Sequence, residues 1–150
     1  MASPSASDAE YLRIERTLPA PRALVYRAFT DPARMLEWFG PHGFTATGVQ
    51  LDVRVGGAWR GGMRGPDGRE LVASGVYREV VANQRLVFTY AWENDGARGH
   101  ETVCQLELAD AGQQTLLKFS QGPFQTSADA LDHQGGWGEA FEKLAAAVAQ

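Results

Sequence analysis

The sequence predicts an α+β fold in which a curved antiparallel sheet of about six to seven strands surrounds one long C-terminal helix. Three observations lead to this prediction. One strand-like segment and two short helical segments come first, and a series of segments with strand periodicity then follows across short turns. Consecutive strands with short turns are typical of an antiparallel meander. The chain ends in a long amphipathic pattern, which can cover the apolar face of such a sheet.

The predicted first strand is followed by two predicted helices. Residues 11–18 alternate polar and apolar side chains, which predicts a half-buried strand with Leu12 and Ile14 on one face. Prolines then end the strand pairing, and residues 23–29 carry the apolar face of a short helix. Pro32 is well placed to begin a second helix, because its missing N–H is not needed in the first turn.

The second helical segment is rich in large apolar side chains. It contains Met35, Trp38 and Phe39 and ends at the Gly40-Pro41 dipeptide. If this segment covers the open end of the sheet, it forms a lid over the mouth of a cavity. Ordinary packing on the sheet edge is the alternative, and the sequence leaves both open.

The middle of the chain has the alternation of strands. The strand-like segments are residues 44–51, 59–64, 70–81, 85–93, 101–109 and 115–121. Residues 65–68 (GPDG) give the strongest turn signal between them. Residues 94–99 are expected to form a polar loop.

The C-terminal segment from residue 127 to residue 150 predicts the long helix. Its apolar residues recur at helical spacing, and they are Trp137, Phe141, Leu144, Ala145 and Val148. Ser127 or Asp129 is expected to cap its first turn. The acidic side chains of Asp129 and Asp132 favour the positive end of the helix dipole.

Three glycines in this helix call for an explanation. Gly135, Gly136 and Gly138 surround Trp137, and each costs roughly 1 kcal/mol relative to alanine in a helix interior. Either close packing of backbones or room for a bound molecule offsets that cost. We expect the glycines to mark the close approach of the helix to the sheet, with Trp137 pointing into the space between them.

Composition narrows the class of protein. The chain has 150 residues and a net charge of −4, and its basic residues are scattered among acidic ones. A nucleic-acid-binding protein usually shows a basic patch, so we expect no nucleic-acid partner. No stretch approaches the ~18 apolar residues of a membrane span. We expect residues 1–9 to be a disordered tail without signal-peptide character, and residues 10–150 to form one domain.

Cysteine usage gives a further indication. Cys104 is the single cysteine, so the chain has no intramolecular disulfide, and this suits a reducing cytoplasm. Its position in a strand-like segment favours the role of a small buried hydrophobic residue.

The ordered motifs resemble a known family. Residues 18–32 (LPAPRALVYRAFTDP) resemble the opening of the START-like (SRPBCC) superfamily, and more closely its branch named after the activator of the heat-shock protein 90 ATPase. Later family segments match in order at residues 38–41 (WFGP), 56–59 (GGAW), 65–68 (GPDG), 75–80 (GVYREV), 85–89 (RLVFT) and 136–137 (GW). The resemblance implies a helix-grip (START/Bet v-like) fold with an apolar cavity between the sheet and the C-terminal helix.

Bulky side chains at strand alternation and on the helix stripe are candidates for the lining of that cavity. The candidate ligand-binding residues are Trp38, Phe39, Trp59, Met63, Phe88, Tyr90, Leu106, Leu117, Phe119, His133, Trp137 and Phe141, and a wider set adds Trp92 and Leu108. Apolar pockets with a few polar groups are the usual ligand sites. The alternative for each residue is simple core packing.

The sequence offers little catalytic or metal-binding chemistry. No histidine has the spacing of a metal ligand, no serine or cysteine lies in a nucleophile motif, and we expect neither a metal nor a cofactor. His133 with a nearby aspartate, or His100 with Glu101, is the only acid–base pairing that the sequence suggests. Tyr77 and Arg60 could contribute polar contacts, but alternation does not decide which face of the sheet they use.

Three hypotheses follow. The first is non-catalytic binding of a small hydrophobic or aromatic ligand of unknown identity. The second is a cyclase- or hydrolase-type enzyme that uses the same cavity. The third, which the resemblance suggests, is a stress-related protein with a chaperone partner. The sequence also leaves a homodimer open.

Overall fold

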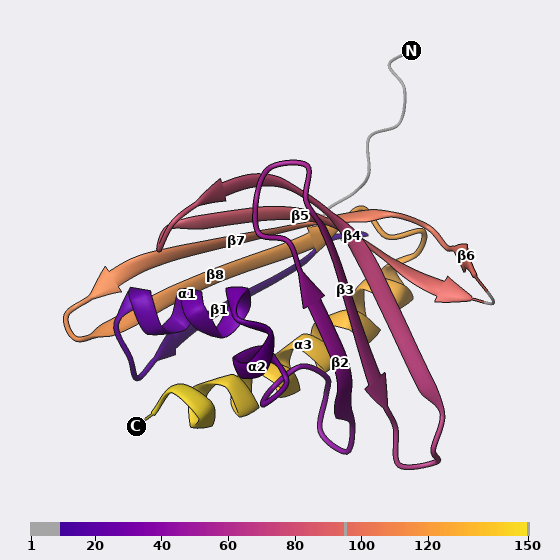
Figure 1. Cartoon of the computed structure of the whole chain (residues 1–150), viewed down its shortest axis with the longest axis horizontal. Coiled ribbons are helices and arrows are strands. Elements are labelled where there is room, and N and C mark those ends of the chain that lie inside the picture. Colours follow the sequence, from indigo (N-terminus) through magenta and orange to yellow (C-terminus); the bar gives the residue numbers. More distant parts are fainter. Residues whose placement is uncertain (1–9, 95, 150) are drawn as a thin grey trace.

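The computed structural model describes residues 10–94 and 96–149, and the predicted N-terminal tail lies outside these residues. A curved antiparallel sheet arches over one long helix, which confirms the predicted α+β helix-grip fold (Figure 1). The strands are β1 (Leu12–Leu18), β2 (Thr45–Leu51), β3 (Ala58–Arg64), β4 (Glu70–Val81), β5 (Arg85–Asn94), β6 (Ala97–Arg98), β7 (Thr102–Ala111) and β8 (Gln114–Gly122), and the helices are α1 (Arg22–Thr30), α2 (Pro32–Met35) and α3 (Ser127–Val148).

The strands follow one another as the turn signals predict. Their order in the sheet is β1-β8-β7-β5-β4-β3-β2, and β6 pairs with β5. The strands from β2 to β8 form the expected meander, while β1 lies at the opposite edge beside β8. The prediction of a loop over residues 94–99 was wrong for residues 97–98, which form β6. A strand of two residues is too short to produce a periodic pattern.

Helix α3 crosses the concave face of the sheet (Figure 1). Trp137, Phe141, Leu144 and Val148 of the predicted stripe are buried. The helix is capped by the side chain of Thr126, whose oxygen accepts a hydrogen bond of 3.1 Å from the backbone N–H at position 129. The predicted caps, Ser127 and Asp129, were therefore wrong. Several neighbouring residues have side chains that can cap a helix, and the residue that does so depends on where the first helical turn begins.

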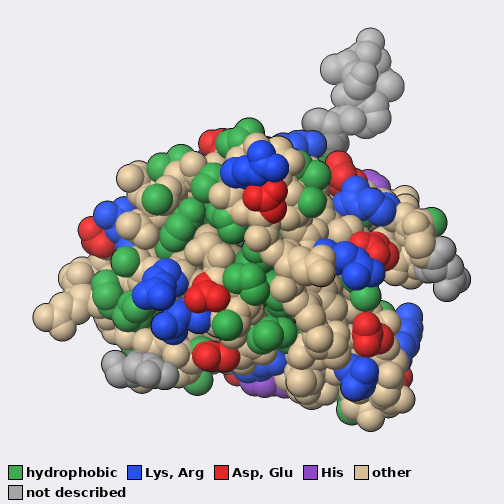
Figure 2. All heavy atoms as spheres, in the orientation of Figure 1, with side chains coloured by type: hydrophobic (Ala, Val, Ile, Leu, Met, Phe, Trp, Pro, Cys, Tyr) green, Lys and Arg blue, Asp and Glu red, His purple; other side chains and the backbone are tan. Residues whose placement is uncertain are grey.

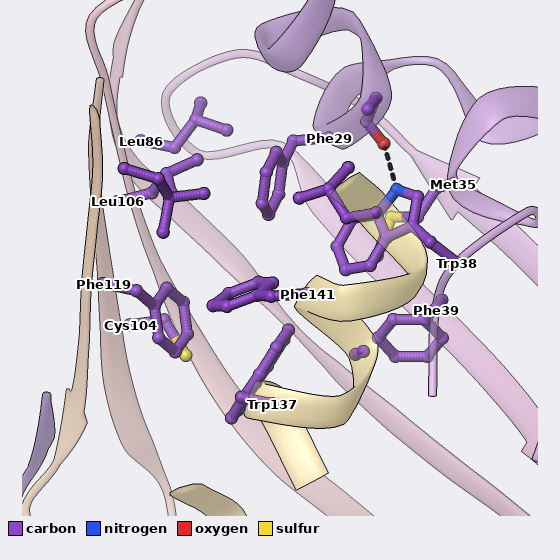
Figure 3. Close-up of a cluster of buried hydrophobic side chains, with 14 of the residues drawn as sticks. Phe29, Met35, Trp38, Phe39, Leu86, Cys104, Leu106, Phe119, Trp137 and Phe141 are labelled. Atoms are coloured by element: carbon purple, nitrogen blue, oxygen red, sulfur yellow. Dashed lines mark hydrogen bonds between the residues drawn. The ribbon is translucent and has the colours of Figure 1, made fainter. Parts of the chain in front are cut away.

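Trp38 supplies a hydrogen bond that the backbone loses where the short helix α2 begins. Pro32 has no N–H, so the carbonyl of Ala28, four residues earlier, lacks its usual helical donor. The indole Nε1 of Trp38 donates a hydrogen bond of 2.9 Å to this oxygen, as the dashed line in Figure 3 shows. Its ring packs edge-on against Phe29 at a centroid distance of 4.8 Å. Because α2 ends at Met35, Trp38 lies in the turns that follow it.

The structure also bears on one prediction, for Cys104, and on one question that the sequence left open, the faces used by Tyr77 and Arg60. Cys104 is fully buried, and burial raises the pKa of its thiol, in keeping with the role of a small hydrophobic residue. Tyr77 faces the interior and is 4% exposed, whereas Arg60 lies outside, where it pairs with Glu93 at 3.0 Å.

The surface carries mixed charge. Figure 2 shows basic and acidic side chains interspersed on the face in view. Among the described helices, none combines the length and the apolar character that crossing a membrane requires.

Replacement of Trp38 by Phe tests the contact with Ala28. Trp38→Phe leaves a buried carbonyl without its donor and removes packed volume, so we expect a loss of about 2–4 kcal/mol in the free energy of unfolding, measured by urea denaturation. Leu36→Ala is the control in the same segment, because Leu36 is 43% exposed. A loss below about 1 kcal/mol in Trp38→Phe would show that Ala28 finds another donor.

Candidate functional site

A cavity of about 210 Å³ lies between α3 and the half of the sheet formed by β3, β4 and β5. It is lined by Phe39, Gly40, Pro41, Phe44, Met63, Leu71, Tyr90, Trp92, Asp132, His133, Gly136, Trp137 and Ala140. These residues come from four places in the sequence: the segment after α2, the β3–β4 hairpin, β5 and the middle of α3.

The helix presents one face to the cavity. Asp132, Gly136 and Ala140 are spaced by four residues, and His133 and Trp137 lie beside them with the same spacing. Residues four apart stack on one side of a helix. Gly136 and Ala140 have the smallest side chains of this set, so they leave space that a larger residue would fill.

The sheet contributes its inward-facing residues. Met63 of β3 lies directly opposite Leu71 of β4 in the antiparallel register. Tyr90 and Trp92 occupy alternate positions of β5, so both point toward α3.

The segment after α2 covers one side of the cavity. Phe39 packs on β3 at Gly61, where an added Cβ would lie 2.9 Å from the ring carbon Cε2 of Phe39. Gly40 then turns the chain with a φ of +108°, a conformation that favours glycine. Pro41 and Phe44 complete this wall.

The structure brings only some of the predicted binding residues to this cavity. Phe39, Met63, Tyr90, His133 and Trp137 line it, as does Trp92 from the wider set. A separate void of about 20 Å³, with room for one water molecule, is bordered by Trp38, Trp59 and Phe88 among others. Phe39 and Trp137 border both spaces, so their rings, 6.4 Å apart, separate the two.

The other predicted residues pack in the core. Leu106, Leu117, Phe119 and Phe141 are at most 2% exposed and border neither space. Figure 3 shows Phe119 and Phe141 on the side of α3 that faces the β7–β8 half of the sheet. There helix and sheet are in direct contact, while the cavity lies on the β3–β5 side.

Sequence reasoning missed several lining residues, namely Gly40, Pro41, Phe44, Leu71, Gly136 and Ala140 as wall positions. Leu71 was hidden because β4 has apolar residues on both faces, so alternation did not identify the inner one. Gly136 carried a signal, which was its energetic cost in a helix, but we expected close packing of the helix on the sheet to offset that cost.

The expected close approach of the α3 glycines to the sheet was wrong. A Cβ at Gly135 or Gly136 would meet no atom within 4 Å, and at Gly138 it would meet only the Arg16 side chain at 3.5 Å. Backbone packing therefore does not require them. Gly136 faces the cavity, whereas Gly135 and Gly138 face an open groove beside β1.

Both ring nitrogens of His133, on the cavity face of α3, are engaged with protein partners. The Nδ1–H of His133 donates to the carbonyl of Asp129 at 2.9 Å, and its Nε2 accepts from the indole N–H of Trp92 at 3.0 Å. These two bonds assign the neutral Nδ1–H tautomer. The expected pairing of His133 with an aspartate carboxylate is not formed.

The second expected acid–base pair is also not formed. His100 contacts the carbonyl of Pro123 at 2.7 Å, and Glu101 instead pairs with Arg98 at 2.8 Å. His100 and Glu101 both lie in the connection between β6 and β7, and each side chain has its own separate partner. Within residues 10–94 and 96–149, His, Cys, Asp and Glu nowhere gather in a group of three that could hold a metal ion.

Trp137 is tied to the sheet by a buried polar chain. Its Nε1 donates to the side-chain oxygen of Gln121 at 2.7 Å. The amide of Gln121 donates to the hydroxyl of Thr102, which donates to the carbonyl of Tyr90. This chain fixes the indole ring that forms one side of the cavity.

The segment over the cavity is fastened to α3. The ammonium of Lys143 donates to the carbonyls of Gly40 and Phe44 at 3.0 and 3.2 Å. Partial burial lowers the pKa of Lys143. His42 adds two contacts, from its backbone N–H to Glu139 and from its ring to Glu142. We name residues 40–44 the cover segment.

The sequence profile described as "Activator of Hsp90 ATPase homolog 1-like protein" matches residues 19–149. The chain belongs to this family. Solved structures share its fold. A protein from Chromobacterium violaceum is 29% identical with a TM-score of 0.85, and the match covers 94% of this chain and 98% of that one. No curated protein matches the sequence.

Two further structures agree. The AHSA1 protein from Silicibacter pomeroyi is 28% identical with a TM-score of 0.84, covering 93% of this chain and 97% of that one. A protein from Arthrobacter aurescens, at 22% identity and a TM-score of 0.85, shows the fold alone, with 95% and 87% of the two chains covered. Membership of the family supports a START/Bet v1-type ligand-binding fold.

The helix glycines give a direct stability prediction. Gly135→Ala and Gly136→Ala should each raise the free energy of unfolding by about 1 kcal/mol, because the added methyl group meets no atom within 4 Å and alanine favours the helix. Urea denaturation of both variants measures this. Destabilisation of either variant would mean that the helix backbone packs more tightly than the structure indicates.

Lys143 should control the mobility of the cover segment. Lys143→Met keeps the aliphatic stem but removes both hydrogen bonds, so amide hydrogen exchange in residues 40–44 should accelerate about tenfold. Lys118→Met is the matched control, because Lys118 is the other lysine of the chain and lies exposed on β8. Equal exchange in wild type and Lys143→Met would contradict the fastening role.

Proposed function

We propose that this protein binds a small, largely apolar molecule in the 210 Å³ cavity beside α3, and that it does not convert it chemically. The observation that carries the proposal is the wall itself, in which aromatic and aliphatic side chains from four parts of the sequence surround one space. Concave apolar spaces with a few polar groups are the usual sites for small ligands.

The family supports the same proposal. It supports a ligand-binding fold of START/Bet v1 type, and the cavity lies between the sheet and the long helix of that fold. Pockets for drug-sized ligands measure about 300–1,000 Å³, so this cavity suits a smaller molecule.

The polar groups favour binding over catalysis. A general base needs a free lone pair within reach of the substrate. Both ring nitrogens of His133 are already engaged, and the Asp132 carboxylate, which lines the cavity, is exposed to solvent and has no such partner beside it in the part of the chain that the structure describes. No acid–base pair therefore converges on the cavity among the described residues.

The matched glycines of α3 give the test. Wild type, Gly136→Leu and Gly135→Leu are compared in thermal unfolding with a panel of small neutral aromatic and alicyclic molecules. Ligand at 100 times its dissociation constant adds about 2.7 kcal/mol, which should raise the wild-type Tm by roughly 5–10 °C. Gly136→Leu should abolish the shift because its side chain enters the cavity, whereas Gly135→Leu faces the groove beside β1 and should retain it.

The same comparison can reject the proposal. If no compound stabilises the wild type, or if both leucine variants lose the shift equally, the cavity is not the binding site. The family description names an activator of the Hsp90 ATPase, which makes a chaperone partner the alternative. Stimulation of Hsp90 ATP hydrolysis that survives Gly136→Leu, without any ligand-induced shift, would favour that alternative.

A further inference from the structure

The hydroxyl group of Tyr90 is the unusual feature of the cavity. Tyr90 is 4% exposed, and no described residue forms a hydrogen bond with its hydroxyl oxygen. Among the described residues, every side-chain nitrogen or oxygen that is sealed from solvent has a partner. The Tyr90 hydroxyl is therefore not sealed in the core, and it must border an open space.

The surroundings of the ring identify that space. The Tyr90 ring lies 5.9 Å from Trp137 and 5.5 Å from Trp92, which both line the cavity. Tyr90 also borders a second hollow on the side of Thr102, where its backbone carbonyl accepts a hydrogen bond from the Thr102 hydroxyl. The side chain of Tyr90 thus belongs to the wall of the cavity beside α3.

The other polar groups of the wall are hydrogen-bonded to each other or to the protein, or are exposed to solvent. The indole N–H of Trp92 and the ring of His133 bond to each other, and Trp137 donates to Gln121. Asp132 is exposed and repels anions. The lining residues include no Lys or Arg, and the ammonium of Lys143 is bound to the cover segment. An anionic ligand would therefore find no counter-ion among the described residues of the wall, and the lining carboxylate of Asp132 lies in solvent rather than among the buried rings.

The volume limits the ligand to a few rings. An apolar cavity of about 150 Å³ holds one benzene molecule. The cavity of about 210 Å³ therefore suits a fused bicyclic molecule and is far too small for a sterol. Because aromatic rings form much of the wall, a flat ligand packs best against it.

Building on the proposed function, we propose that Tyr90 is the polar anchor of the cavity and that the ligand is a neutral bicyclic molecule with one hydrogen-bond acceptor, such as a ketone oxygen. The hydroxyl donates to that acceptor while the rings pack among Phe39, Met63 and Trp137. Burial raises the pKa of Tyr90, so the hydroxyl keeps its proton at neutral pH and remains a donor.

A cycle of two ligands and two proteins isolates this hydrogen bond. The dissociation constants of α-tetralone, a bicyclic ketone, and of tetralin, its parent hydrocarbon, are measured for wild type and for Tyr90→Phe. The ratio of the two constants removes the effect of ring burial. We expect Tyr90→Phe to weaken the binding of α-tetralone, relative to that of tetralin, on the order of tenfold. The infrared carbonyl stretch of bound α-tetralone should show a hydrogen bond in wild type and lose it in Tyr90→Phe.

The matched control is Tyr77→Phe. Tyr77 is likewise a buried tyrosine whose pKa is raised by burial, but it borders the void of about 20 Å³. Its replacement should leave the ratio unchanged. Thermal unfolding of both variants without ligand checks that each is folded. Naphthoate, an anion of similar shape, should bind wild type at least about tenfold more weakly than α-tetralone because its charge would be buried unpaired.

The outcomes separate the two proposals. If both probes bind and Tyr90→Phe leaves their ratio unchanged, Tyr90 is not the anchor, but the proposed function stands. If naphthoate binds as tightly as α-tetralone, the proposal that the ligand is neutral is wrong. Failure of both neutral probes to bind wild type overturns this inference. Failure of the whole panel of apolar molecules overturns the proposed function as well.

Discussion

The attachment of Trp137 to the sheet is the interaction on which the site depends. Its indole N–H is held by Gln121 in a fully buried hydrogen bond, and its ring packs on Phe119 at 4.7 Å. A buried polar group without a partner costs about 1–3 kcal/mol, so this bond favours one position of the ring. The middle of α3 is thereby fixed close to β8. The same ring forms part of the cavity wall on its other side.

The cavity exists because α3 packs unevenly on the sheet. On the side of β7 and β8, Phe119 and Phe141 fill the space between helix and sheet (Figure 3). On the side of β3 to β5, the helix presents Gly136 and Ala140, which are too small to reach the opposite wall. Protein interiors are normally filled to crystal-like density, so a space of this size beside small helix residues points to a role.

Both apolar contacts and hydrogen bonds hold the cover segment over the cavity. Phe39 and Phe44 supply the apolar surface, while Lys143 holds the backbone between them by two hydrogen bonds. The indole N–H of Trp92 donates to Nε2 of His133, and this hydrogen bond joins β5 to α3. Both ring nitrogens of His133 are then engaged. Among the described residues, the buried tyrosines Tyr77 and Tyr90 both keep a hydroxyl without a hydrogen-bond partner, and of these two only Tyr90 lines the cavity. This arrangement suits selection of a ligand by shape and one hydrogen bond.

The sequence by itself determined the elements, the meander and the buried stripe of α3, because hydrophobic periodicity and turn residues are local signals. It also marked Tyr90, Met63 and Trp137 as inward-facing. It could not separate them from Phe119 and Phe141, since alternation gives the face of a strand and not its distance from a helix. Only the tertiary structure decided where α3 crosses the sheet and that Gly136 borders the cavity. That position results from the packing of residues far apart in the chain, which no local pattern records.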